Sequence, residues 1–205
     1  WIEGAKYNFV AVVNGTNVNA NSNALPTSIE YTANGSNDLL YARSQEYVGK
    51  ASGNPLVKFE FAHLLSKVKF TLENTTPVGT EQNPIGIYTY TLTDIKISNA
   101  ITKGTYTINN ETWSTTENPA LGQAFDAITD VTNGESEECA NEKLLIPLEN
   151  ATVSCNINLY YGGALISTIE KERPTVIEKE TIGGQISMSP KVENYPTIQQ
   201  ISGTE

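Results

Sequence analysis

One stretch of the sequence, Val57–Leu72 with the letters VKFEFAHLLSKVKFTL, decides the fold. In its first half the apolar side chains occupy odd positions from Val57 to Phe61 and are separated by Lys58 and Glu60. Alternation with a period of two is typical of a β-strand that has one buried face and one solvated face. The stretch therefore predicts β-structure, and the rest of the chain can be compared with it.

The alternation slips by one residue within this stretch. In the second half the apolar side chains of Val68, Phe70 and Leu72 occupy even positions. Such a slip would turn these side chains to solvent unless a bulge, a bend or a switch between sheets separates the two halves. The sequence places this irregularity at Ala62–Ser66, and a solvated bulge there would leave Ser66 exposed.

The same alternation recurs along the chain, between segments rich in Asn, Gly and Thr. Many short strands at roughly ten-residue spacing are typical of an all-β sandwich and not of a parallel α/β fold. The one helical candidate, Pro119–Ile128, is equally compatible with an ordered loop. Glu149–Thr152 is predicted to be a hairpin turn. The alternating segments are Tyr7–Val13, Tyr88–Leu92, Ile95–Ile97 after a slip near Asp94, Leu144–Leu148 and Val153–Tyr161.

A change of composition near Asn74–Pro84 marks the best candidate for a linker. It divides the chain into an N-terminal β-sandwich domain, residues 1–76, and a C-terminal β-sandwich domain, residues 77–205. The first piece is short for a complete sandwich. We therefore expect the first domain to be partial, with N-terminal strands missing from this chain.

Charge excludes several classes of partner. The 205 residues include 13 basic and 23 acidic side chains, which gives a formal net charge of −10. This sign is wrong for neutralising phosphates or anionic lipid headgroups, so we expect no nucleic-acid partner. No apolar run is long enough to cross a membrane as a helix, so we expect no transmembrane segment.

The sequence contains no convincing catalytic set. His63 is the single histidine, which excludes zinc sites built on two or three histidines and leaves any catalytic triad dependent on that residue. Its apolar neighbours favour a hydrogen-bonded structural histidine over a general base. Ser66 and Lys67 are adjacent in a predicted strand, so their side chains point to opposite faces and cannot form a dyad. We expect a protein that is not an enzyme and that has no cofactor and no metal site.

Cys139 and Cys155 are the two cysteines of the chain. They fit one disulfide in an oxidising compartment, and they fit two unpaired buried thiols equally well.

The stretch Val57–Leu72 resembles the hallmark strand of the Bacteroides-type fimbrillin-like family, V-x-F-x-F-x-H-x-L-S-K-V-x-F. KYNFVAVVN at Lys6–Asn14, DLLYA at Asp38–Ala42 and LLIPL at Leu144–Leu148 resemble further segments of that family in the same order. The signature positions in this chain are Val57, Phe59, Phe61, His63, Leu65, Ser66, Lys67, Val68 and Phe70.

The resemblance implies two transthyretin-like Greek-key β-sandwich domains in a major or minor fimbrial subunit. It implies a lipoprotein precursor that is exported to the outer membrane and assembled into a fimbrium at the cell surface, where it supports cell adhesion. The implied partners are other fimbrial subunits, joined by donor-strand exchange, in which an extended segment of one subunit fills a groove of the next. Tyr195–Glu205 is a candidate donor strand, with an ordinary tail as the alternative. A second reading is a tip adhesin that binds host glycan or protein through loops such as Asn14–Leu25 or Glu111–Gly134.

Overall fold

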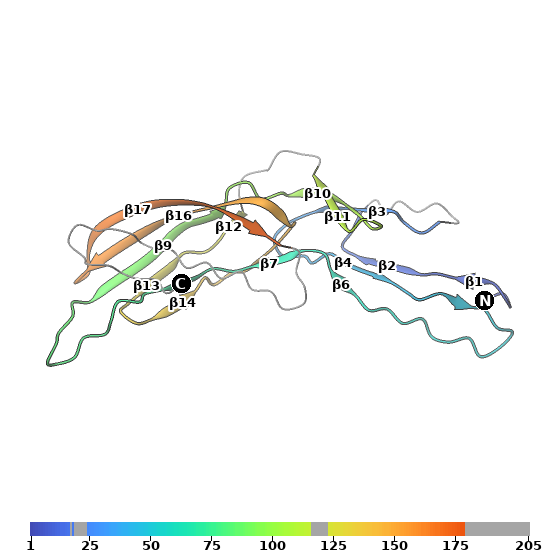
Figure 1. Ribbon diagram of the computed structural model, residues 1–205, viewed down its shortest axis with the longest axis horizontal. Coiled ribbons are helices and arrows are strands. Elements are labelled where there is room, and N and C mark those ends of the chain that lie inside the picture. Colours follow the sequence, from blue (N-terminus) through green and yellow to red (C-terminus); the bar gives the residue numbers. More distant parts are fainter. Residues whose placement is uncertain (17, 19–23, 116–122, 179–205) are drawn as a thin grey trace.

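The computed structural model describes residues 1–16, 18, 24–115 and 123–178. These residues form seventeen β-strands and contain no helix, which confirms the predicted all-β fold. The molecule is elongated, and most of its strands run along the long axis (Figure 1). The helix considered for Pro119–Ile128 is wrong over its described part, because Gln123–Ala124 and Ile128 belong to strands.

One half of the molecule is built on a five-stranded antiparallel sheet (Figure 1). Its two longest strands form a hairpin whose register is continuous except for two irregularities. Two short strand pairs accompany this sheet, β8 with β14 and β7 with β15. In their order across the sheet the strands are β12 (Gln123–Ala124), β9 (Tyr88–Ile97), β16 (Leu148–Tyr161) and β17 (Ala164–Ile177), and β13 (Ile128–Val131) also pairs with β9. The short pairs are β8 (Thr71–Glu73) with β14 (Ser136–Glu138) and β7 (Ser66–Val68) with β15 (Lys143–Leu145).

The other half contains three smaller sheets, with the orders β2-β4-β6, β11-β10-β3 and β1-β5. β3 pairs with β10 in antiparallel register although more than seventy residues separate them in the sequence, with Ser28 opposite Thr107. The strands are β1 (Lys6–Tyr7), β2 (Val10–Val13), β3 (Ser28–Thr32), β4 (Leu40–Arg43), β5 (Tyr47–Val48), β6 (Ala62–His63), β10 (Lys103–Thr107) and β11 (Thr112–Thr115).

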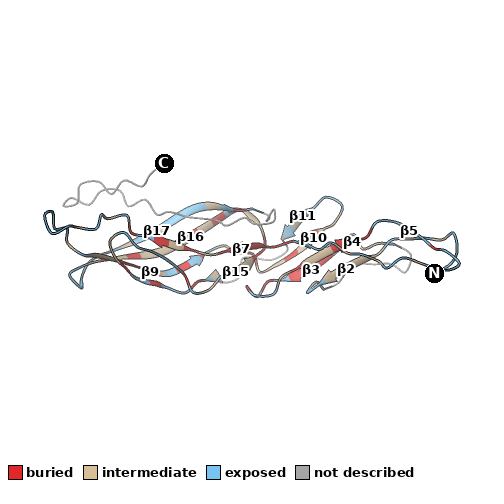
Figure 2. Ribbon diagram, turned by 90° about the horizontal axis from the view of Figure 1, so that it is seen from below, coloured by how far each residue is buried: buried red, intermediate tan, exposed pale blue. Residues whose placement is uncertain are grey.

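Two hydrophobic clusters form the core, one in each half (Figure 2). The first joins the inner faces of β9, β13 and β16 to Val68 and Phe70. The second joins Leu64 to the inner faces of β3 and β10, and it also takes up Ile146. Each cluster thus contains buried residues from both sides of residue 76. The division of the chain into domains at that position stays a prediction.

The slip in Val57–Leu72 coincides with the passage of the chain from one cluster to the other. Leu64 and Leu65 belong to the second cluster, whereas Val68 and Phe70 belong to the first. The strands on either side of the slip also pair with different partners, β6 with β4 and β7 with β15. The sequence left open a bulge, a bend or a switch between sheets at this point, and the structure has the switch between sheets.

The solvated bulge at Ser66 is therefore wrong. Ser66 is only 3% exposed, and its hydroxyl donates a hydrogen bond to the backbone carbonyl oxygen of Glu178. The serine is polar, but it lies where the chain crosses between the two clusters, and there the backbone of the segment after β17 supplies an acceptor.

Two other irregularities lie in the five-stranded sheet. The predicted turn at Glu149–Thr152 is wrong, because these residues belong to β16 and Ala151 is fully buried opposite Thr175. The interruption is instead a shift of register between Leu148 and Ala151. The slip predicted near Asp94 is confirmed: the register between β9 and β16 shifts there, and Asp94 has a positive φ of 52°.

Candidate functional site

An aromatic cluster lies at the N-terminal end of the molecule. The ring of Trp1 lies with its centroid 4.9 Å from that of Tyr7, 5.7 Å from that of Phe9 and 6.0 Å from that of Tyr47. The Tyr47 side chain is buried, whereas Trp1 is 47% exposed. We call these four residues the aromatic end cluster. It combines one anchored ring with a solvent-facing indole, which is unusual for a core and typical of a contact surface.

The first half of the signature stretch borders this cluster. The backbone N–H of Lys58 donates a hydrogen bond of 3.1 Å to the Tyr47 hydroxyl. The rings of Phe59 and Phe61 lie 6.2 Å apart, and Phe61 is 44% exposed. Val57 and Phe59 are half-buried while Lys58 and Glu60 are exposed, as the alternation predicted. The strand predicted for this half is wrong, because residues 57–61 form no strand and β6 begins only at Ala62. Apolar side chains thus line this end of the molecule without being fully covered by the described residues.

The sheet next to this surface has open edges. β4 lies between β2 and β6, so each of these outer strands has no strand partner on its far side among the described residues. β10 and β11 lie toward the middle of the molecule, whereas β1 lies at the N-terminal end (Figure 1). An open strand edge beside exposed apolar side chains can accept an extended segment, which gains backbone hydrogen bonds and apolar contacts together.

His63 lies on the outer strand β6 and bonds through Nδ1 to a carboxylate oxygen of Asp38. Its side chain is 54% exposed, so the apolar surroundings inferred from its neighbours are wrong. Leu64 and Leu65 point into the second cluster, whereas the imidazole does not.

The Asp38 carboxylate also acts on Tyr31. Burial first, and this carboxylate second, raise the pKa of Tyr31 to about 12. The described residues contain no group of three or more His, Cys, Asp or Glu that could hold a metal ion.

The second half of the signature stretch alternates between core and surface. Leu65, Val68 and Phe70 are buried. Lys67 points outward and forms an ion pair of 2.8 Å with Glu142, and Lys69 pairs with Glu138. We call Leu64–Phe70 the switch segment, because the chain passes there from the second cluster to the first. The pairing of β7 with β15 and the ion pair between Lys69 and Glu138 connect this segment to β15 and β14.

The two cysteines are free thiols in the structure. Cys139 is buried, accepts a hydrogen bond of 3.3 Å from the backbone N–H of Phe70 and donates one of 2.9 Å to the carbonyl oxygen of Asn141. Cys155 is half-buried, and burial raises the pKa of its thiol, with Lys171 acting in the opposite direction. Of the two alternatives that the sequence left open, the structure has the unpaired thiols.

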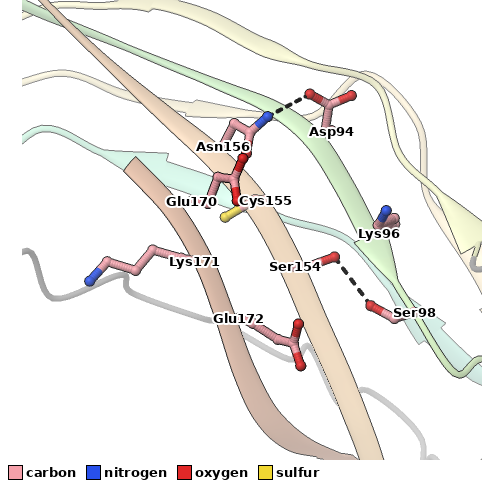
Figure 3. A pocket seen from close by; sticks show the side chains of 9 residues that line it. All are labelled: Asp94, Lys96, Ser98, Ser154, Cys155, Asn156, Glu170, Lys171 and Glu172. Atoms are coloured by element: carbon pink, nitrogen blue, oxygen red, sulfur yellow. Dashed lines mark hydrogen bonds between the residues drawn. The ribbon is translucent and has the colours of Figure 1, made fainter. Parts of the chain in front are cut away.

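A polar hollow of about 640 Å³ lies on the five-stranded sheet, across β9, β16 and β17 (Figure 3). Sequence reasoning missed it. The available signals were the slip near Asp94 and the polar side chains at alternate positions of β16, Ser154, Asn156 and Asn158. The lining residues are Asp94, Lys96, Ser98, Ser154, Cys155, Asn156, Glu170, Lys171 and Glu172.

The segments proposed from the sequence as binding loops fall partly or wholly outside the described residues. Asn14–Leu25 and Glu111–Gly134 are described in part, and Tyr195–Glu205 lies entirely outside. Within the described part of the chain, no helix has the length and apolar character needed to cross a membrane.

Comparison with known proteins assigns the chain to a family. Among solved structures it is similar to a fimbrial protein from Bacteroides vulgatus, with a TM-score of 0.53 and 15% identity over 86% of this chain and 68% of that one. A candidate cell adhesion protein from Bacteroides ovatus gives 0.45 and 12% over 92% of this chain and 63% of that one. No curated protein matches. The model of the fimbrillin-like family matches residues 1–202, and the chain therefore belongs to the fimbrillin-like family.

Proposed function

We propose that this protein is a structural, non-enzymatic subunit of a fimbrium on a bacterial cell surface, where it supports cell adhesion. Membership of the fimbrillin-like family supports this proposal. The fold is similar to that of a fimbrial protein from Bacteroides vulgatus. The elongated shape suits a subunit that must span distance along a polymer (Figure 1).

Subunits of this kind are joined, in our proposal, by donor-strand exchange. The observation that carries this step is the open-edged sheet β2-β4-β6 beside the aromatic end cluster. An extended segment of a neighbouring subunit would pair with an open edge and place its apolar side chains against Phe61 and the exposed indole of Trp1. Burying these partly exposed groups is favourable by about 25 cal/mol for each Å² of apolar surface removed from water.

The wider setting is part of the same proposal. The precursor is exported as a lipoprotein to the outer membrane, and its partners are other fimbrial subunits. The two halves of the molecule correspond to two transthyretin-like β-sandwich domains, of which the N-terminal one is completed by a strand from another chain. The open edges of β2 and β6 support this last point.

Size-exclusion chromatography and mass spectrometry of the full-length secreted protein, before and after brief trypsin treatment, test the proposal. In our proposal a protease cuts the precursor at an arginine and removes or frees a strand before assembly. Trypsin, which cleaves after arginine and lysine, mimics this step. Polymers that appear after cleavage, and that survive unheated detergent electrophoresis as a ladder, are the expected result. A product that stays monomeric at high concentration contradicts assembly by strand exchange.

Two matched variants locate the contact. Phe61→Lys places a charge in the proposed acceptor surface, so the ladder should weaken while the thermal unfolding midpoint stays close to that of the parent protein, because Phe61 is 44% exposed. Ile87→Lys makes the same kind of change at a residue that is 64% exposed in the other half of the molecule, ahead of β9. It should polymerise like the parent protein. Equal losses in both variants would contradict the assignment of the acceptor surface.

A further inference from the structure

We propose that the polar hollow on the five-stranded sheet is a binding site for a neutral oligosaccharide. It lies across β9, β16 and β17, in the half of the molecule away from the aromatic end cluster (Figure 1). The hollow therefore uses none of the residues assigned to subunit assembly, and the two proposals can succeed or fail separately.

The hollow is associated with a β-bulge. Ser154 pairs with Lys96 and Asn156 pairs with Thr93, so two residues of β9, Asp94 and Ile95, stand opposite the single residue Cys155. Asp94 takes up the extra residue with a φ of 52°, a left-handed conformation that aspartate tolerates better than most side chains do. A bulge bends its strand and redirects a side chain. Here it leaves Ile95 in the core and directs the Asp94 carboxylate to the solvent side, toward Asn156 (Figure 3).

Hydrogen bonds between neighbouring strands hold the side chains of this face in place. The Asn156 amide donates to the Asp94 carboxylate at 2.8 Å, and the hydroxyls of Ser98 and Ser154 lie 3.2 Å apart (Figure 3). Farther along the same face, Thr168 donates to the Asn158 amide oxygen at 2.7 Å. A ligand that binds here therefore meets groups whose rotamers are already fixed, which lowers the entropic cost of binding.

These contacts do not use up the hydrogen-bonding capacity of the lining. A carboxylate offers about four acceptor positions, an amide has two donor hydrogens and an acceptor oxygen, and a hydroxyl both donates and accepts. The register places Glu170 opposite Asn156 and Glu172 opposite Ser154. Each of these polar residues of β16 therefore has a carboxylate as its neighbour on β17. Acceptors are thus spaced at the repeat of the sheet, about 4.8 Å between strands and about 7 Å along them.

The chemistry of the lining indicates the class of ligand. No large apolar side chain lines the hollow, so a lipid or an aromatic compound would gain little from entering it. The lining carries the carboxylates of Asp94, Glu170 and Glu172 and the ammonium of Lys96, which lies on β9, across β16 from the two glutamates, while Lys171 points away from the other labelled side chains (Figure 3). Anions are disfavoured by this set. Sugar hydroxyls are complementary to it, because each one can donate to a carboxylate and accept from an ammonium, amide or hydroxyl.

The size of the hollow agrees with a ligand of a few sugar rings, since small-molecule sites commonly measure about 300–1,000 Å³. The described residues contain no group of three or more His, Cys, Asp or Glu that could hold a metal ion. The carboxylates of the hollow are therefore not arranged as the ligands of one cation. The occupant that fits best is an uncharged chain of hexose or N-acetylhexosamine units, held by hydrogen bonds to the face of the sheet.

Nuclear magnetic resonance titration of the full chain tests the site directly. The side-chain amides of Asn156 and Asn158 are the reporters, and the probes are neutral glucose-, galactose-, mannose- and N-acetylglucosamine-based oligosaccharides at millimolar concentration. At least one probe should cause saturable shifts of the Asn156 amide and of backbone amides in β9, β16 and β17. Asp94→Asn, which keeps a residue that tolerates positive φ, and Glu170→Gln should each raise the Kd roughly tenfold, as expected for loss of a charge-assisted hydrogen bond.

Asp130→Asn is the matched control. Asp130 is another exposed aspartate with a positive φ, 59°, and it lies in β13, outside the lining of the hollow. Its variant should bind like the parent protein. Three results overturn the proposal: no saturable shift with any oligosaccharide, equal weakening in Asp94→Asn and Asp130→Asn, or shifts produced only by a lysine-rich peptide or by Ca²⁺. Polymer formation by the Asp94→Asn variant is measured in parallel. This variant should polymerise like the parent protein, so a failure of oligosaccharide binding can be distinguished from a failure of fimbrial assembly.

Discussion

The ring of Phe125 meets the ring of Phe70 edge to face, with centroids 4.7 Å apart and planes inclined at 82°. Both residues belong to the first hydrophobic cluster, and they connect the end of the signature stretch to the segment between β12 and β13. The contact shows that the phenylalanines of the signature stretch have different roles, because Phe70 is buried whereas Phe61 is exposed.

Phe70→Ala should therefore destabilise the protein by about 3–5 kcal/mol, the range found when a buried phenylalanine is truncated and leaves a cavity. Urea unfolding followed by tryptophan fluorescence or circular dichroism measures this change. Phe61→Ala is the control and should cost less than about 1 kcal/mol, as exposed positions usually do. Equal costs for the two variants would contradict the described burial.

Ser66→Leu should also be destabilising. The substitution forces extra volume into a position that is 3% exposed, and it leaves the carbonyl oxygen of Glu178 without its hydrogen bond. Overpacking and a lost buried hydrogen bond together cost about 2–4 kcal/mol. Lys67→Ala, at the exposed neighbouring position, removes only a surface ion pair with Glu142 and should cost less than about 1 kcal/mol. A Ser66→Leu protein as stable as the parent in urea would show that the position is solvated.

Tyr31 should remain un-ionised to higher pH than an exposed tyrosine. Burial and the Asp38 carboxylate raise its pKa to about 12, so the folded state holds this proton more tightly than the unfolded state does. Its contribution to stability is full below pH about 10, the unfolded value, and is lost as the pH rises through the folded value. Ultraviolet difference titration of phenolate formation, compared between the parent protein and Tyr31→Phe, isolates this group.

Asp38→Asn provides the second arm of that experiment. Because the carboxylate is the smaller of the two causes, the variant should lower the pKa of Tyr31 only in part, and it should remain above that of an exposed tyrosine. A pKa that returns to the ordinary value of about 10 would show that charge, and not burial, is the main cause.

Both cysteines should be found as free thiols by chemical labelling. Cys155 should react slowly with a thiol reagent under native conditions, because burial raises its pKa, and Cys139 should react only after unfolding. Mass spectrometry after labelling in denaturant, without reductant, should find both residues modified. A fully unlabelled protein that gains both labels only after reduction would instead demonstrate a disulfide between them.

Much of the fold could be predicted from local patterns. The slip of the alternation after Phe61 correctly indicated a break in the chain, and the alternation at Val68–Leu72 indicated the buried positions around β7 and β8, because the burial of one face leaves a pattern in adjacent residues. The strand predicted for residues 57–61 is absent. The nature of the break could not be predicted. It depends on Ile146 and on β15, which meet the switch segment from far along the chain, and a local pattern contains no information about such partners.

The errors have the same origin. Phe125 and Ile128 have a spacing that fits a helix, but Phe125 packs on Phe70 and Ile128 stands opposite Leu92 of β9, so tertiary contacts override the local spacing. The polar hollow was missed because its residues come from β9, β16 and β17, and only the register of these strands brings them together.

The pairing of distant strands also determines when the molecule can fold. β3 cannot form its hydrogen bonds to β10, nor β7 those to β15, before the later strand has been synthesised. The second cluster is likewise incomplete until Ile146 is present. Long-range pairing of this kind makes folding slow, because long loops must close before the contacts that stabilise them form. During synthesis the first hundred or so residues consequently lack native partners for part of their apolar surface, and the second cluster is completed only after Ile146 has been made.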